Sequence, residues 1–119
     1  MQNSKQYDLE KRSFEFAKRV REFVKKLNRT ISNIEDSKQL IKASGSVGAN
    51  YIEANESLSK KDFILRIKIS RKEAKESRYW LQLIDVAQEN ALEKERQILI
   101  KESTELMMIF SSIMRKFVH

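Results

Sequence analysis

Three glutamates and a lysine are the residues of this chain best suited to acid–base chemistry. Glu73 and Glu76 lie three positions apart, Lys72 stands beside them, and Glu53 precedes them in the chain. A carboxylate pair can act as acid and base, and carboxylates on neighbouring helices can hold two metal ions. Helical di-metal sites also use histidine, however, and the only histidine is the last residue, His119. Because Lys72 can neutralise a carboxylate, the pattern favours a structural network over an enzyme.

We therefore predict no catalytic residue, no metal and no cofactor. The charged residues are assigned instead to a polar network that sets the register between two helices, together with polar residues at steps of three, four and seven. The predicted members of this network are Gln39, Ser46, Asn50, Glu53, Lys72, Glu73 and Glu76.

Basic residues recur in pairs at seven-residue spacing near the start of the chain. The pairs, with one further arginine, are Lys11, Arg12, Lys18, Arg19, Lys25, Lys26 and Arg29. Seven helical residues span about 10.5 Å, so the spacing predicts a double row of cations on one helix face. A sugar–phosphate backbone can lie along such a row, which predicts electrostatic, weakly sequence-selective binding of RNA or DNA. The phenylalanines are expected on the opposite side, so base stacking is not predicted.

The overall charge is compatible with two interpretations. The formal net charge of +7 and the pI near 9.7 suit an acidic partner, of which nucleic acid is the commonest. Alternatively, the basic rows are an ordinary solvated face in which Glu15 pairs with Arg19 and Glu22 pairs with Lys26. The protein would then be a protein-interaction scaffold without a nucleic-acid role.

Both glycines of the chain, Gly45 and Gly48, lie within the segment ASGSVGANYIEA, residues 43–54. A phosphate-binding loop needs a lysine after its last glycine, and a dinucleotide site needs three spaced glycines after a strand. Neither pattern is present. Glycine inside a helix costs up to about 1 kcal/mol relative to alanine, so its presence calls for a local reason. We predict that a small-residue surface lets a neighbouring helix approach closely. Its members are Ala43, Ser44, Val47, Gly48 and Ala54.

Apolar residues recur at steps of three and four along the chain, which predicts four amphipathic helices. The predicted starts are Asp8, Asn33 with Asp36, Ser59 with Asp62, and Ala91 or Glu93. The first helix is expected to fade near 28–32, the second to end near 57 and the third near 88–90. The predicted inward residues are Leu9, Phe16, Val20, Phe23, Val24, Leu27, Ile31, Leu40, Ser44, Val47, Tyr51, Leu58, Phe63, Ile67, Ser70, Ala74, Ser77, Leu81, Ile84, Leu99, Ser103, Leu106, Phe110, Ile113 and Phe117.

These helices and their short connections predict an all-α fold, an antiparallel up-down-up-down four-helix bundle that forms a single domain over residues 1–119. The chain has no cysteine, which excludes disulfides and thiolate metal sites. No segment has the apolar length of a signal peptide or a membrane span, so we expect a cytoplasmic protein without a membrane partner.

The central part of the chain is similar to a known family. The segments QLIKASGSVGANYIEA and SKKDFILRIKISRKEAKESRYWLQL carry the similarity, which covers most of the chain and is strongest over 39–83. In them the chain resembles the four-helix-bundle family of 23S rRNA intervening-sequence open reading frames. The matching positions are Gln39, Leu40, Ser44, Gly45, Ser46, Val47, Ala49, Asn50, Tyr51, Glu53, Ala54, Asp62, Phe63, Lys72, Glu73, Ala74, Glu76, Ser77, Tyr79, Trp80 and Leu81.

This resemblance implies a four-helix bundle that assembles as a ring, typically a homopentamer. A relative of the family, the accessory variability protein of diversity-generating retroelements, binds nucleic acid and a reverse transcriptase. The resemblance therefore implies a homo-oligomer as one partner, and RNA or DNA and a reverse transcriptase or other protein as further partners. Most other members of the family have no assigned activity.

Extra apolar rows also favour an oligomer. A monomeric bundle needs one apolar stripe per helix, and methionine suits an adaptable contact. In the last helix, the predicted interface residues beside the inward stripe are Ile100, Met107, Met108 and Met114. The third helix has a second row as well, formed by Leu65, Ile69, Trp80, Leu83 and Ala87. The alternative for the last helix is a wide arc that faces the core.

Overall fold

The computed structural model describes residues 4–117, with side chains from residue 9 onwards; His119 and the side chain of Asp8 lie outside the described part. It contains four α-helices and, over residues 4–117, no strand. The helices are α1 (Ser4–Lys25), α2 (Ile31–Asn55), α3 (Lys60–Leu83) and α4 (Asn90–Arg115). The all-α prediction is confirmed.

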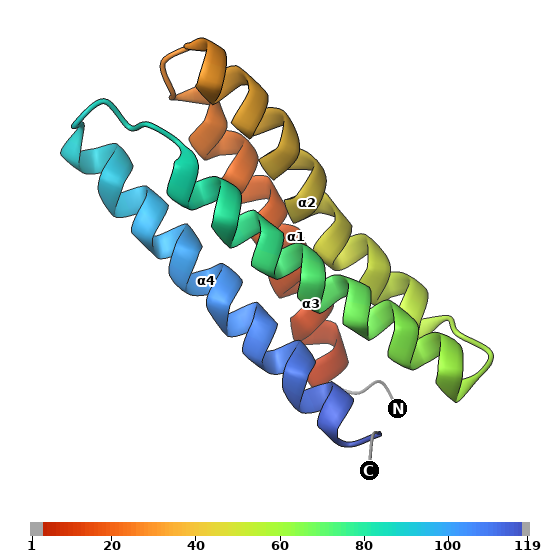
Figure 1. Ribbon diagram of the computed structural model, residues 1–119. Coiled ribbons are helices and arrows are strands. Elements are labelled where there is room, and N and C mark those ends of the chain that lie inside the picture. The colour runs from red at the N-terminus through yellow and green to blue at the C-terminus, as the bar shows by residue number, and fades with distance from the viewer. Residues whose placement is uncertain (1–3, 118–119) are drawn as a thin grey trace.

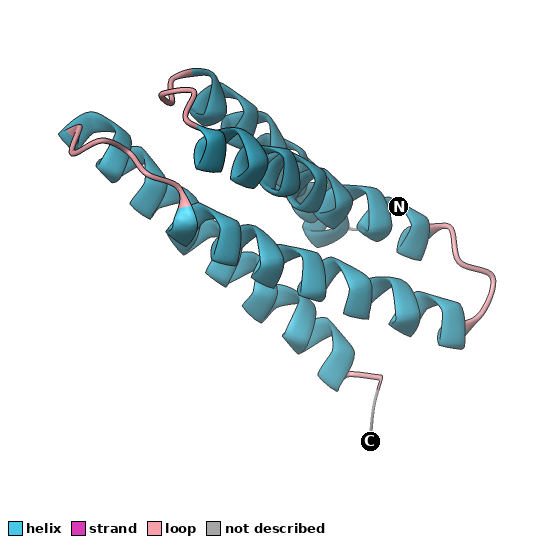
Figure 2. Ribbon diagram, turned by 45° about the horizontal axis from the view of Figure 1, so that its top comes forward, coloured by secondary structure: helices cyan, strands magenta, loops and turns pink. Residues whose placement is uncertain are grey.

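The helices form an antiparallel bundle with extents of 45 × 24 × 22 Å (Figure 1). Each helix packs against its neighbours in the chain, and α1 closes on α4, while the diagonal pairs have no close approach in the described part. Loops join adjacent helices at opposite ends of the bundle (Figure 2). The up-down-up-down topology is therefore as predicted. Helices α2 and α3 share the most extensive contact, and α1 and α4 share the least.

The core consists mainly of the predicted apolar stripes. Its fully buried large residues include Phe16, Val20, Phe23, Leu40, Val47, Ile67, Leu81, Leu99, Leu106 and Phe110. Serines occupy inward positions on several helices, where their small size lets the backbones approach. Ser70 Oγ donates across the α2–α3 contact to the backbone oxygen of Val47 at 2.9 Å, so burial does not leave this hydroxyl unpaired.

Three predicted inward residues are instead exposed, and all three lie at or beyond the end of a helix. Ile31 is 85% exposed, Leu58 is 101% exposed and Phe117 is 37% exposed. Ile31 begins α2 rather than continuing α1, because the chain turns between them. Leu58 lies in the turn between α2 and α3. The helical period that places these residues inward does not continue through a turn.

Several predicted helix boundaries are wrong. Helix α1 already begins at Ser4, four residues before Asp8, and ends at Lys25. Helix α2 is capped by Thr30 and not by Asn33, since Thr30 Oγ1 accepts from the backbone nitrogen of Asn33 at 3.1 Å. The predicted cap at Ser59 is confirmed by its bond from the nitrogen of Asp62, also 3.1 Å.

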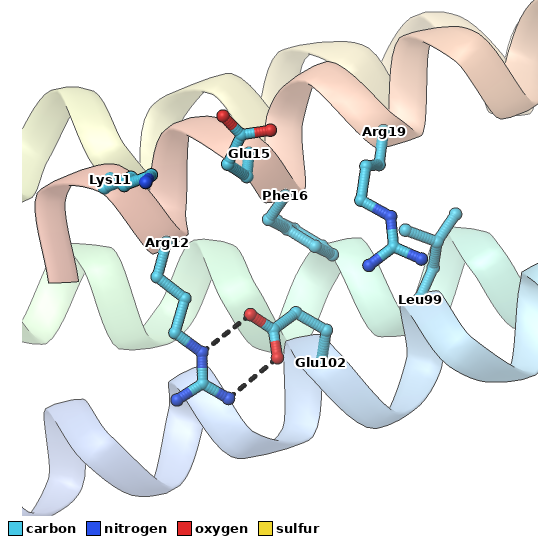
Figure 3. A pocket seen from close by; sticks show the side chains of 7 residues that line it. All are labelled: Lys11, Arg12, Glu15, Phe16, Arg19, Leu99 and Glu102. Atoms are coloured by element: carbon cyan, nitrogen blue, oxygen red, sulfur yellow. Dashed lines mark hydrogen bonds and ion pairs between the residues drawn. The ribbon is translucent and has the colours of Figure 1, made fainter. Parts of the chain in front are cut away.

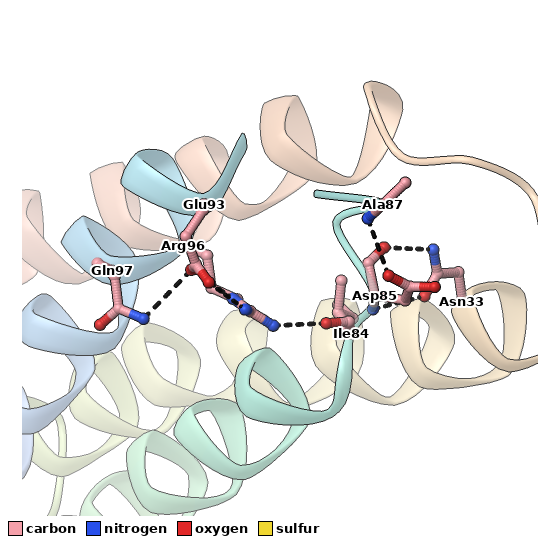
Figure 4. A network of polar contacts seen from close by, with 7 residues as sticks. All are labelled: Asn33, Ile84, Asp85, Ala87, Glu93, Arg96 and Gln97. Carbon is pink, nitrogen blue, oxygen red and sulfur yellow. Dashed lines mark hydrogen bonds and ion pairs between the residues drawn. The ribbon is translucent and has the colours of Figure 1, made fainter. Parts of the chain in front are cut away.

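Helix α3 ends at Leu83, about five residues earlier than predicted, because side chains hold the loop that follows (Figure 4). Arg96 of α4 donates to the backbone oxygen of Ile84 and forms an ion pair with Glu93. Hydrogen bonds from Arg96 and, to a smaller extent, from Gln97 stabilise the charged Glu93 carboxylate and lower its pKa to about 2. The bond from Arg96 to Ile84 joins the start of the loop to α4, and the pair with Glu93 within α4 orients the Arg96 side chain.

Gly48 confirms the predicted close approach of a neighbouring helix. A Cβ atom at this position would lie 3.1 Å from Ser13 Cβ of α1 and 3.8 Å from the backbone nitrogen of Phe14. The neighbour is therefore α1 itself, and its backbone lies against the glycine. Gly45 differs, because the nearest atom to its missing Cβ is the end of the Arg21 side chain at 3.2 Å.

Ser13 offers a test of this contact. It is fully buried, and its hydroxyl has no hydrogen-bond partner among the described residues. A buried hydroxyl without a partner is unfavourable by about 1–3 kcal/mol, so we expect Ser13→Ala to raise the free energy of unfolding by about 1 kcal/mol. Urea denaturation followed by circular dichroism measures this change. A loss of stability would mean that the hydroxyl is bonded, for example through a buried water.

Candidate nucleic-acid interface

Helix α1 presents the predicted cations on the side away from Phe16, Val20 and Phe23, which are buried in the core. The structure divides the cations into two rows with different surroundings. An inner row turns toward α4 and consists of Arg12, Arg19 and Lys26. An outer row consists of Lys11, Lys18 and Lys25, and all three are exposed.

Two of the three inner-row cations form ion pairs with carboxylates of α4, and Figure 3 shows the pair made by Arg12. Arg12 binds Glu102 through two bonds of 2.7 and 2.8 Å, and it contacts Glu105 at 3.3 Å. These contacts raise the pKa of the Arg12 guanidinium, and the hydrogen bond to Glu102 has the largest effect. Lys26 pairs with Glu95 at 3.1 Å. The predicted interface residues Arg12 and Lys26 therefore join α1 to α4.

Arg19 lies between these two pairs and borders an open cavity in the α1–α4 seam. The cavity has a volume of about 390 Å³ (Figure 3). Its lining residues are Lys11, Arg12, Glu15, Phe16, Arg19, Leu99 and Glu102. Lys11 of the outer row also reaches the rim of this cavity, so three cations and two carboxylates line it and leave it only weakly basic.

The outer row keeps its charge available to solvent. Lys25 pairs with Glu22 of the same helix at 3.3 Å, and both side chains are more than half exposed, so the attraction is weak. The alternative pairs Glu15–Arg19 and Glu22–Lys26 do not form within the described residues, since Lys26 turns to α4 and Glu22 to Lys25. Arg29 is exposed but lies in the loop after α1, so it does not extend a helical row.

The expectation that no aromatic residue accompanies the cations is wrong. Phe14 is 60% exposed, and Lys18 Nζ lies 5.9 Å from the centre of its ring. Phe14 is not a member of the predicted inward stripe that runs through Leu9, Phe16 and Val20, and this position was the available signal for its exposure. An exposed ring beside a row of lysines is a group on which a base can stack.

The predicted polar network is only partly present. Gln39 and Glu53 are exposed. Asn50 instead accepts a bond from Arg66 at 3.0 Å and donates to the backbone oxygen of Ser46 at 2.9 Å. Arg66 was not among the predicted members of the network. Its bond to Asn50 joins α3 to α2, whereas the predicted members Gln39 and Glu53 face solvent.

The remaining members gather around Glu73, which is half-buried. Burial raises the pKa of Glu73 most, and the neighbouring Glu76 raises it further, while Lys72 and the Ser46 hydroxyl lower it. Lys72 and Glu76 are themselves exposed. Within the described residues there is no group of three or more carboxylate or histidine side chains that could hold a metal ion.

The predicted interface residues of α4 divide in a similar way. Ile100, Met107 and Met114 are half-buried and pack against the core, which is the wide core-facing arc of the alternative interpretation. Met108 is 63% exposed and is the one member of this set that a partner could cover extensively. None of α1–α4, in its described part, combines the length and apolarity needed to cross a membrane.

The fold and the basic face together define a four-helix-bundle protein with one cation-rich helix. The model of the family "23S rRNA-intervening sequence protein" matches residues 5–112, and the chain belongs to this family. A crystal structure of a protein of unknown function from the S23 ribosomal protein family of Bacteroides thetaiotaomicron VPI-5482 is similar. It shares 31% identity with a TM-score of 0.78, over 93% of this chain and 98% of that chain. The search of curated proteins gave no match.

Proposed function

We propose that the protein is a non-enzymatic, ring-forming helical bundle that binds RNA or DNA through backbone contacts. The observation that carries this proposal is the outer row of α1, where Lys11, Lys18 and Lys25 are exposed at seven-residue intervals. Each can contact a phosphate without breaking an ion pair to another helix. The net charge of +7 supports an acidic partner.

Phe14 makes a single strand the better ligand within this proposal. In a duplex the bases are already stacked, whereas a single strand can place a base on an exposed ring. Phe14 lies between Lys11 and Lys18 in sequence on the same helix, so a strand that follows the lysines passes its ring. Binding would combine phosphate contacts with one stacking contact and would depend little on sequence.

The test is a binding titration with a triple variant, Lys11→Glu, Lys18→Glu and Lys25→Glu. Its fold should persist, because these side chains are exposed and the Arg12 and Lys26 pairs with α4 remain. We expect the parent to lose affinity for mixed-sequence single strands as salt rises, with a log–log slope of about −2 if the three lysines contact phosphates. The triple variant should show no measurable binding under the same conditions.

A matched control changes Lys42, Lys94 and Lys101 to glutamate, which gives the same net charge on other exposed faces. This control should keep most of the affinity if the outer row is the interface. Phe14→Ala should weaken single-strand binding roughly tenfold, in line with about 1–3 kcal/mol per stacked base, without changing the salt slope. If the triple variant and the control bind alike, the scaffold function takes the place of nucleic-acid binding.

The ring is the second part of this proposal. Its support is the exposed Met108 on α4, together with the ring assembly implied by the resemblance. Light scattering at micromolar concentration should give several times the chain mass of 14.1 kDa. Met108→Glu should lower that mass by placing a charge in an apolar contact. A parent protein that remains monomeric under these conditions would exclude the ring.

The alternative function is a protein-interaction scaffold, for which the exposed apolar side chains of α3 are the supporting observation. A reverse transcriptase is a candidate partner only through the resemblance to retroelement accessory proteins. Failure of nucleic-acid binding combined with retained assembly favours this alternative.

A further inference from the structure

The outward face of α3 carries an apolar stripe that no described residue covers. Leu65 is 54% exposed, Tyr79 is 55% exposed and Leu83 is 50% exposed. The stripe lies about half a turn away from the core positions Ile67 and Leu81, which are fully buried. It therefore adds nothing to the bundle interior, and exposed apolar rows of this kind commonly mark an interaction surface.

The stripe has the spacing of a coiled-coil seam. Its six positions follow one another at alternating steps of four and three along α3. They are Leu65, Ile69, Lys72, Glu76, Tyr79 and Leu83. Apolar residues occupy both ends of the stripe, and one cation and one anion occupy its middle.

The order of these residues is self-complementary when the helix is reversed. An antiparallel copy centred at position 74 places Leu65 opposite Leu83 and Ile69 opposite Tyr79. The same register places Lys72 opposite Glu76. Each pairing occurs twice about a two-fold axis. Each also places a heptad a position of one helix opposite a d position of the other, as in antiparallel coiled coils. All three pairings thus follow from one register.

We infer that a second copy of this chain docks on this face, with α3 packed antiparallel against α3 of the copy. The apolar residues form two clusters, and between them Lys72 of each copy faces Glu76 of the other. Charge complementarity at the centre sets the register, because a shift by one heptad would break both central pairs. The contact does not depend on nucleic-acid binding.

Two further features of the structure fit this partner. Beside Leu65 lies an open hollow of about 590 Å³, where Leu83 of the second copy would lie. Its other lining residues are Lys60, Lys61, Asp62, Ile64 and Lys68. The Tyr79 ring is held at 5.0 Å from Trp80 in an edge-to-face contact. Tyr79 is therefore positioned before association, which lowers the entropy lost on docking.

The size of the contact sets its strength. The stripe spans about 27 Å of helix, which gives an area near the lower limit of specific interfaces, roughly 1,000 Å². At one edge of the contact, Lys75 of one copy lies opposite Lys75 of the other, and the repulsion between the two ammonium groups weakens the association. We therefore expect micromolar association that weakens on dilution, and Lys75→Ala should tighten it severalfold.

A charge exchange tests the geometry. Lys72→Glu gives each copy two acids in the central pairs, and Glu76→Lys gives each copy two bases, so each variant alone should lose the contact. An equimolar mixture should regain it, because one partner then supplies the acids and the other the bases. Light scattering reports the mass of each sample, circular dichroism confirms the fold, and Lys94→Glu serves as the control. Unchanged masses for both single variants would overturn the inference.

Cross-linking gives a second measurement, since the chain has no cysteine of its own. Leu65→Cys alone should not form a disulfide dimer, because the two copies of position 65 lie about 27 Å apart. Mixed with Leu83→Cys and oxidised, it should cross-link efficiently. Self-cross-linking of the first variant, or none in the mixture, contradicts the register. If the ring of the proposed function does not form but the α3 contact does, the parent protein should have twice the chain mass. That mass should still fall in each charge variant and return in their mixture.

Discussion

Replacing Gly48 with leucine should lower the free energy of unfolding by about 2–3 kcal/mol. The reason is the position of α1. The first side-chain carbon at Gly48 would already lie 3.1 Å from Ser13 Cβ and 3.7 Å from the Ser13 backbone carbon. Three further carbons would have to displace the helix backbone itself, and the rigid packing of α1 through Phe16 and Val20 resists that movement. Urea denaturation of parent and variant measures the change.

Gly45 provides the matched control, because it lies in the same helix three residues earlier. Its nearest neighbour is the end of the Arg21 side chain, which can swing into solvent, so Gly45→Leu should have little effect or stabilise the helix. Gly48→Ala should fall between the two, since a crowded Cβ opposes a gain of up to about 1 kcal/mol in helix propensity. Equal losses for the two leucine variants would contradict a specific contact between Gly48 and α1.

Much of this fold could be predicted because the inward residues repeat at helical spacing inside each helix. Phe16, Leu40, Ile67 and Phe110 illustrate this, since each lies on a predicted stripe and is buried. Gly48 could likewise be interpreted by elimination, because no phosphate-binding pattern surrounds it. Local sequence carries these features, so local reasoning was sufficient for them.

The helix ends were harder to predict because side chains distant in sequence decide them. Helix α3 continues in the apolar pattern to Ile84 and Val86, and no glycine or proline marks its end. Nevertheless Ala87 and Gln88 adopt left-handed backbone angles, with φ of 54° and 60°. Non-glycine residues adopt this conformation only when their surroundings stabilise it. Here Asp85 Oδ1 accepts from the Ala87 nitrogen, and Asn33 of α2 and Arg96 of α4 bind the preceding residues 84 and 85.

The placement of the candidate-site cations could be predicted in outline but not in detail for the same reason. The seven-residue spacing placed the cations on one face of α1, yet it could not separate Arg12 from Lys11. That separation depends on Glu102 of α4, ninety positions away in the chain. Phe14 shows the converse, because local sequence indicates its exposure: it lies outside the inward stripe through Leu9, Phe16 and Val20.

The loop after α3 depends above all on Asn33 of α2, which is only 2% exposed (Figure 4). Its amide donates to the backbone oxygens of Asn28 at 3.0 Å and Asp85 at 2.9 Å, and it accepts from the Asp85 nitrogen at 3.0 Å. Asn28 belongs to the loop between α1 and α2, and Asp85 to the loop between α3 and α4. One side chain therefore ties together the two loops at this end of the bundle.

Asn33→Ala should lower the free energy of unfolding by about 2–3 kcal/mol, because three hydrogen bonds disappear and their partners regain water only in part. Thr30→Ala is the matched control, since it removes the α2 cap but leaves the bridge, and it should be destabilising by about 1 kcal/mol. Hydrogen exchange adds a local measurement: the amide of Asp85 should exchange much faster in Asn33→Ala and nearly unchanged in Thr30→Ala. Similar losses of stability and similar exchange in the two variants would show that the bridge contributes no more than an ordinary cap. The loop geometry, including the left-handed residues 87–88, would then have to be held by Arg96 and by the bond from the Ala87 nitrogen to Asp85 Oδ1 at 2.8 Å.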